Sequence, residues 1–285
     1  MNNKSGNTSL IEKLGVSILL LISGFLVFVL GTNYYSIFPT NDSQIYRVVL
    51  VIFFLGVAFV LRRNESFKNY SFIAYAFFIS TVVYFVTSLT AKLRDSFFKS
   101  IRISFSTPCH LALTKVFEVT LVIAVIIVLT LLWGEKLSSL YLRKGRLGLS
   151  LFIGLCLLLI NTATGIVTGV TLGQSGEQII SKLPWALLFA LANGLMEELL
   201  FRGLFLKKFI SIIGVTGSIV VTSIVFTVMH AAASYMNPFE AILFQVIIFP
   251  MALLFGYLIY KTDNIWGSVL YHAGSDVFLF YLMAL

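Results

Sequence analysis

Residues 191–208 read LANGLMEELLFRGLFLKK, an apolar stretch of helix length with two adjacent glutamates near its middle. An ionisable side chain inside a membrane helix costs at least about 2.5–3.5 kcal/mol on insertion scales, so it marks a functional site by default. Arg202 follows Glu198 by four residues, which places the two side chains on one helix face within ion-pair reach. Glu197 is rotated by about 100° from that face, so it does not share the ion pair equally and is available for another role. The alternative, non-functional interpretation is that these charges mark a helix end exposed to water, as Lys207 and Lys208 suggest.

The composition around this stretch indicates a membrane protein. Hydrophobic residues make up 59% of the 285-residue chain and charged residues 11%, against about 45–50% and 25% in soluble proteins. So few charges cannot cover a soluble globule of this size. Disorder is excluded because there is too much apolar surface to bury. We predict an all-α fold, a polytopic transmembrane helical bundle of about eight to nine spanning helices.

A spanning helix needs about 20 mostly apolar residues. The candidate spans are residues 14–31, 45–61, 70–90, 111–133, 147–172, 184–206, 213–235, 239–260 and 264–284. Lysine and arginine gather in the loops at 62–68 and 134–146, which predicts a cytoplasmic N-terminus. The same basic loops account for the net charge of +8, because they face anionic lipid on the cytoplasmic side. No nucleic-acid partner is therefore expected. Residues 91–106 carry four cations on the opposite side and are interpreted as an amphipathic helix in the membrane interface.

Two later helices carry further polar residues at helical spacing. His230 follows Phe226 by four residues, and Asp276 follows His272 by four residues in the last helix. Each feature alone is consistent with an ordinary buried histidine or a polar clamp between helices. Polar faces within lipid point inward, however, so three such helices are expected to converge on one site. Asn193, four residues before Glu197, is a candidate hydrogen-bond partner for that carboxylate.

This set of side chains suits hydrolysis. A carboxylate in an apolar pocket can act as general base on water, and a histidine can hold that water. A second polar pair can donate to a developing oxyanion. The alternative is a zinc site made by Glu197, His230 and His272, since two histidines and a glutamate form a catalytic zinc ligand set. No H-E-x-x-H motif is present, so we favour a site without metal or other cofactor.

At these residues the sequence resembles the CPBP family of intramembrane proteases. This family includes the type II CAAX prenyl endopeptidases and the bacterial Abi-like proteins linked to bacteriocin processing and self-immunity. Its motifs are E-E-x-x-x-R, F-x-x-x-H and H-x-x-x-N or H-x-x-x-D on successive membrane helices. In this chain they stand as Glu197-Glu198-x-x-x-Arg202, Phe226-x-x-x-His230 and His272-x-x-x-Asp276. The resemblance covers residues 180–280, about the last third of the chain.

The resemblance implies a metal-independent glutamate protease. In that family picture Glu197 activates water with help from His230, and His272 stabilises the oxyanion together with the residue at position 276. Glu198 and Arg202 are implied to hold the site together as an ion pair. Asp276 departs from the asparagine of the eukaryotic prenyl proteases. An aspartate donates to an oxyanion only when protonated, so Asp276 could instead orient His272, or bind a metal if one is used.

We therefore expect an intramembrane endopeptidase in the cell membrane. Residues 1–150 are predicted to be N-terminal transmembrane helices of unassigned role, and residues 151–285 a CPBP-like protease core. Its partners would be a peptide or membrane-anchored protein substrate and the lipid bilayer. The alternatives are a non-proteolytic scaffold, regulator or bacteriocin-immunity protein that binds a membrane protein through its N-terminal helices, or a proton-coupled transporter.

Overall fold

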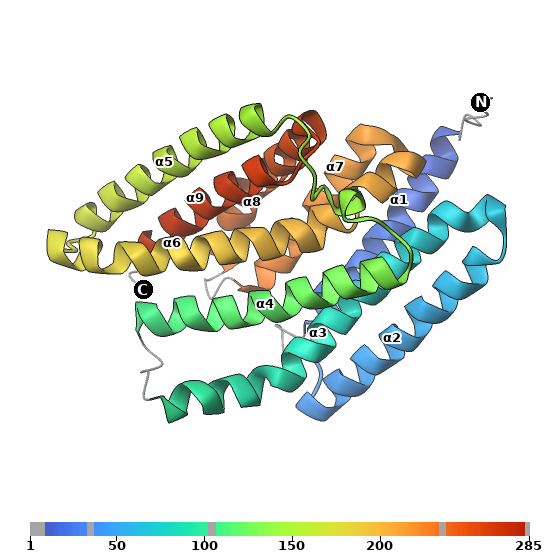
Figure 1. The fold of residues 1–285 in the computed structure, drawn as a ribbon, viewed down its shortest axis with the longest axis horizontal. Coiled ribbons are helices and arrows are strands. Elements are labelled where there is room, and N and C mark those ends of the chain that lie inside the picture. The colour runs from blue at the N-terminus through green and yellow to red at the C-terminus, as the bar shows by residue number, and fades with distance from the viewer. Residues whose placement is uncertain (1–8, 33–36, 102–106, 234–237, 283–285) are drawn as a thin grey trace. The chain divides into compact units, whose positions relative to one another are not determined.

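The computed structural model describes residues 9–32, 37–101, 107–233 and 238–282, and within these ranges its regular elements are all helices (Figure 1). Eight of the described helical segments are long and apolar enough to cross a membrane. The predicted fold class, a polytopic helical bundle, is therefore confirmed. The ninth predicted span forms α9 (Trp266–Leu282), whose 17 described residues lie at the lower limit of the range of about 17–25 residues for a spanning helix.

The chain divides by its internal contacts into two compact units. The first comprises Met1–Thr81 and Leu204–Leu254, and the second comprises Val82–Gly203 and Phe255–Leu285. Each unit therefore combines two segments that are separated in the sequence. The functional boundary expected at residue 150 stays a prediction.

In the first unit, aromatic packing and a buried arginine hold the N-terminal helices. Its elements are α1 (Leu10–Gly24), η1 (Phe25–Leu30), α2 (Thr40–Arg62), η2 (Glu65–Phe67), the first part of α3 (Lys68–Ser100), α7 (Leu206–Ala233) and most of α8 (Pro238–Thr262). The Phe205 ring lies 5.8 Å from Phe28 and 4.7 Å from Phe77, measured between centroids. Arg47 Nε donates to the Gly31 carbonyl at 2.6 Å. This bond satisfies a carbonyl that the helix end leaves without an intrahelical partner.

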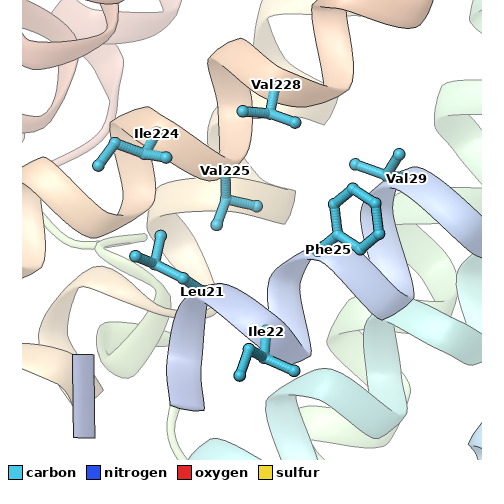
Figure 2. A pocket seen from close by; sticks show the side chains of 7 residues that line it. All are labelled: Leu21, Ile22, Phe25, Val29, Ile224, Val225 and Val228. Atoms are coloured by element: carbon cyan, nitrogen blue, oxygen red, sulfur yellow. The ribbon is translucent and has the colours of Figure 1, made fainter. Parts of the chain in front are cut away.

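An apolar pocket of about 310 Å³ lies between α1–η1 and α7 within the first unit (Figure 2). Its lining residues are Leu21, Ile22, Phe25, Val29, Ile224, Val225 and Val228. Beside it Gly24 allows α1 to approach α7, because a Cβ at Gly24 would stand 2.5 Å from a Val225 methyl group. None of the lining side chains can act as an acid, base or nucleophile, so this pocket is not the candidate active site.

The second unit contains a row of packed helices. Its elements are the rest of α3, α4 (Pro108–Leu132), η3 (Leu137–Leu140), α5 (Leu147–Thr171), α6 (Gly176–Glu198), η4 (Leu199–Gly203), the end of α8, and α9. Helix α4 packs on α6, α6 on α9, and α9 on α5 (Figure 1). Helix α6 begins before the predicted start at residue 184, because Ser175 and Gln178 form a capping box at its N-terminus.

The amphipathic segment predicted at 91–106 is not a separate helix over its described part. Helix α3 continues without a break through Ser100, and residues 102–106 lie outside the described residues. Leu93 and Phe97 are exposed on this extension, at 67% and 52%. The described part of the predicted amphipathic segment is therefore the end of a 33-residue helix.

Helix α9, which carries two of the predicted site residues, is fixed at its start by α5. Ser150 Oγ donates to Asn264 Oδ1 at 2.7 Å and accepts from the Gly267 backbone N–H at 2.8 Å. A Cβ at Gly154 would lie 2.8 Å from the Gly267 Cα, so the two backbones approach closely there. In lipid, helix association depends on such close packing and on hydrogen bonds between helices. This contact sets the height and rotation of α9 in the second unit.

Candidate active site

The candidate site is built by the end of α6, the following π-helical turn η4, and α9. Glu197 and Glu198 are the last two residues of α6, and Arg202 lies in η4. Single π-helical turns are rare and occur often at functional sites. Asn193, Glu197, Glu198, Arg202, His272 and Asp276 are all buried. Membrane burial of so many ionisable groups requires that they satisfy one another.

Glu198 is the centre of this polar cluster. Its Oε1 accepts from Arg202 Nη1 at 2.9 Å, as the spacing of four residues predicts. The same oxygen lies 2.9 Å from His272 Nδ1, and Oε2 accepts from Ser268 Oγ at 2.7 Å. A carboxylate with two such donors besides arginine can only accept, so His272 carries a hydrogen on Nδ1. Glu198 therefore fixes the orientation of the His272 ring and a hydrogen on its Nδ1, as well as neutralising Arg202.

The opposite edge of the His272 ring faces two further carboxylates. His272 Nε2 lies 3.5 Å from Glu197 Oε2 and 3.8 Å from Asp276 Oδ1. Glu197 and His272 are thus brought together, as the convergence of polar helix faces predicts. The nearest carboxylate to His272 is Glu198 rather than its helical neighbour Asp276, because the α6–α9 crossing brings Glu198 against Nδ1.

Asn193 has a different hydrogen-bond partner from the one predicted. Its Nδ2 donates to Asp276 Oδ2 on α9 at 3.0 Å, whereas the sequence suggested a bond to Glu197 on its own helix. Residues four apart share a helix face, but that face packs on α9, and Asp276 presents an acceptor there. Asn193 therefore holds Asp276 in place.

Phe255, on α8, is a site residue that no sequence pattern indicates. Its ring stacks on His272 with centroids 4.8 Å apart and an interplanar angle of 9°. The Arg202 guanidinium lies over the same ring at 5.4 Å. A phenylalanine among 27 carries no signal in the sequence, and only the packing of α8 against α9 identifies it. Phe255 covers the polar cluster and restrains the imidazole plane.

His230 lies in the first unit, on α7. Its Nδ1 is 2.8 Å from the Phe226 carbonyl oxygen, and the two rings are 4.2 Å apart. A carbonyl can only accept, so Nδ1 carries the hydrogen and Nε2 is the acceptor nitrogen of the neutral ring. The spacing of Phe226 and His230 thus orients an imidazole whose Nε2 can accept a proton.

The residues that the structure describes contain no cluster of potential metal ligands. No three His, Cys, Asp or Glu side chains there are arranged as a metal site. Cys109 is partly buried on α4 and Cys156 is exposed on α5, and neither forms a disulfide. Metal independence stays a prediction, which the zinc content of the purified protein can decide.

The approach of α6 to α9 at Gly194 permits the contacts of the site. A Cβ at Gly194 would lie 3.0 Å from the Val269 carbonyl oxygen and 3.2 Å from the Ala273 nitrogen, both backbone atoms. We expect Gly194→Ala to push α9 outward and to lower both the thermal stability and any catalytic activity, with an overpacking cost of about 1–3 kcal/mol. Gly56→Ala is the matched control, because a Cβ there meets nothing within 4 Å and α2 is helical.

Thermal melts of both variants in detergent or nanodiscs measure this difference. Gly56→Ala should be neutral or stabilising by up to about 1 kcal/mol, since alanine favours helix. A Gly194→Ala variant as stable as the Gly56→Ala variant would contradict the inferred close approach.

Residues 179–278 match the model of one protein family, described as type II CAAX prenyl endopeptidase Rce1-like. The matched segment contains all three predicted motifs, and the predicted family is thereby confirmed for this part of the chain. No curated protein and no solved structure matches the chain significantly.

Proposed function

We propose that this chain, whose residues 179–278 match the Rce1-like family, is an intramembrane endopeptidase that hydrolyses a peptide bond with a water activated by Glu197. The observation that carries the proposal is the 3.5 Å contact between Glu197 Oε2 and His272 Nε2 inside a buried polar cluster. A carboxylate and an oriented imidazole at this distance can both reach one reacting group placed beside them.

The proposed reaction begins when Glu197 accepts a proton from water. The resulting hydroxide attacks the carbonyl carbon of the scissile peptide bond, and negative charge develops on the carbonyl oxygen. His272, in its imidazolium form with Nδ1–H held by Glu198, donates its Nε2–H to that oxyanion. When the tetrahedral intermediate collapses, the C–N bond breaks and Glu197 returns its proton to the leaving amine. No metal or other cofactor takes part in this scheme.

Two residues complete the proposed machinery. His230 assists Glu197 with the attacking water through its acceptor nitrogen, a role that the family motif implies. Asp276 is proposed as a positioning residue for His272, because Asn193 holds its Oδ2 while Oδ1 faces the imidazole. This assignment fits an aspartate where the eukaryotic prenyl proteases have asparagine, since it needs no donor at position 276.

The proposed setting follows from the membrane spans. The protein is a multi-pass membrane protein, and the cell membrane with a cytoplasmic N-terminus is the proposed location because lysine and arginine gather in alternate loops. The substrate would be a peptide or a membrane-anchored precursor, which reaches a buried site by lateral movement in the bilayer. The N-terminal helices could bind a membrane protein partner.

The function is tested by comparing membranes from cells that produce the wild type or Glu197→Gln. Mass spectrometry of peptide termini should find one or more cleavage products that require the wild type and are missing with the variant at equal protein level. Identical terminal peptides in both samples would contradict a protease and favour the non-proteolytic scaffold or immunity protein.

Metal dependence gives a separate prediction. We expect the purified protein to contain no stoichiometric zinc and to keep its activity in EDTA and phenanthroline, because glutamate chemistry needs no Lewis acid. Elemental analysis and a cleavage assay with and without chelator measure this. About one zinc per chain, with activity lost on chelation and restored by zinc, would make Glu197, His230 and His272 ligands instead.

A further inference from the structure

A short loop before α5, residues 141–146, is bound to the turn that connects α8 to α9. The Arg146 backbone N–H donates to the Thr262 carbonyl oxygen at 2.7 Å, and Asn264 Nδ2 donates to the Lys144 carbonyl oxygen at 3.2 Å. On the side of the loop both bonds use backbone atoms. The charged side chains of this docked loop are therefore not needed to hold it on the turn.

The docked loop and the end of α8 together present three exposed cations. Lys144 and Arg146 are exposed in the loop, and Lys261 is exposed in the last turn of α8. None of the three pairs with a carboxylate among the residues that the structure describes. The carboxylate of Asp263, in the turn, already pairs with Arg143 at 2.8 Å. The three charges therefore suit an anion from outside the protein.

Aromatic side chains indicate that these cations lie at the level of lipid headgroups. The docked loop and the turn adjoin the ends of two candidate membrane spans, in α5 and in α8. Tyr257, Tyr260 and Trp266 flank the turn and are all exposed. Tyrosine and tryptophan gather at the interface between membrane and water. Lys261 Nζ lies 5.5 Å from the centroid of the Tyr257 ring, so this lysine follows an aromatic surface toward the interface.

We propose that Lys144, Arg146 and Lys261 bind the headgroup phosphate of an anionic phospholipid. Phosphate oxygens accept charge-assisted hydrogen bonds from lysine and arginine, and cations next to a membrane span attract anionic lipid. The exposed aromatic residues favour a lipid over a soluble phosphate, because they set the cations at the surface of the bilayer. This is one site with three named residues, in contrast to the diffuse attraction between basic loops and an anionic membrane.

The proposed lipid site is connected to α9 through Asn264. While its Nδ2 holds the docked loop, its Oδ1 accepts from Ser150 Oγ at 2.7 Å and from the Trp266 backbone N–H at 3.1 Å. Trp266 is the first residue of α9, the helix that carries His272. Bound lipid would therefore hold the docked loop on the turn and stabilise the start of α9.

Thermal melts in nanodiscs test the site without any substrate. One set of discs contains phosphatidylcholine alone, and in the other set phosphatidylglycerol replaces part of it. The wild type should melt roughly 3–6 °C higher with phosphatidylglycerol, because a ligand that binds only the folded state stabilises it. Hydrogen exchange should slow severalfold at the Arg146 and Ile265 amides, which donate across the contact between loop and turn. Inorganic phosphate added to discs of phosphatidylcholine should give no shift.

Two variants separate the charges from the fold of the loop. Lys144→Gln/Arg146→Gln/Lys261→Gln removes the three cations and keeps the backbone atoms that dock the loop. This variant should melt as the wild type does in phosphatidylcholine and should lose the shift with phosphatidylglycerol. Lys144→Arg/Arg146→Lys/Lys261→Arg keeps the charges and should keep most of the shift.

The matched control is Arg62→Gln/Arg63→Gln/Lys68→Gln, which removes as many exposed cations from the connection between α2 and α3. It should keep the wild-type shift. An undiminished shift without the three site cations, an equal loss in the control, or unchanged exchange at the amides between loop and turn would overturn the site. A shift of the same size with inorganic phosphate would overturn its assignment to lipid.

Discussion

Glu197→Gln is expected to lower kcat by about 10²–10⁴-fold, the usual contribution of a general base. The amide keeps the shape of the side chain beside His272 but removes the oxygen that accepts the proton from water. The variant should fold as the wild type does, because Glu197 lies beside the Glu198–Arg202 pair rather than within it. Initial rates on a defined substrate, with a thermal melt of the same samples, measure the two effects separately.

The matched control is Glu177→Gln, a carboxylate exposed in the first turn of the same helix. It should keep the wild-type rate. Full activity in Glu197→Gln, or equal losses in both variants, would refute the assignment of Glu197 as the base.

Arg202→Ala is expected to cost about 3–5 kcal/mol of stability, because it leaves Glu198 buried without its cation. Both side chains of the pair are completely buried, with exposures of 0%. The loss should also disturb His272, whose Nδ1 lies on the same Glu198 oxygen. Denaturant or thermal unfolding of purified protein measures the effect, and the expected melting temperature is well below that of Glu197→Gln.

Arg143→Ala serves as the control for the charge itself. Arg143 also pairs with a carboxylate, that of Asp263 at 2.8 Å, but its side chain is 40% exposed and that of Asp263 43%. Exposed pairs contribute about 0–1 kcal/mol, so this variant should melt close to the wild type. Similar melting temperatures for Arg202→Ala and Arg143→Ala would contradict the buried ion pair.

Features that depend on one helix could be predicted from the sequence. Apolar runs identify the spans because a bilayer requires about 20 such residues. The contact of Glu198 with Arg202 follows from the pitch of a helix, which brings residues four apart together. The length of α3 could not be predicted in this way, because the charged residues near its end are consistent both with a break in the helix and with its continuation.

Contacts between helices could not be predicted in detail. Asn193 bonds to Asp276, and His272 to Glu198, because of the crossing of α6 and α9 at Gly194. That crossing depends on the close approach of the two backbones, which has no periodic signal in the sequence. The motifs therefore indicate which residues matter, and the packing determines which of them touch.

The most direct test of the central claim is hydrolysis of one peptide in heavy-oxygen water by purified protein in nanodiscs. The peptide would span a cleavage site found in the comparison of membranes with wild type and Glu197→Gln. The proposed mechanism predicts a new C-terminal carboxylate that carries the heavy oxygen with the wild type and is absent with Glu197→Gln. Intact peptide after incubation with folded wild type, or the same labelled product from both proteins, would contradict it.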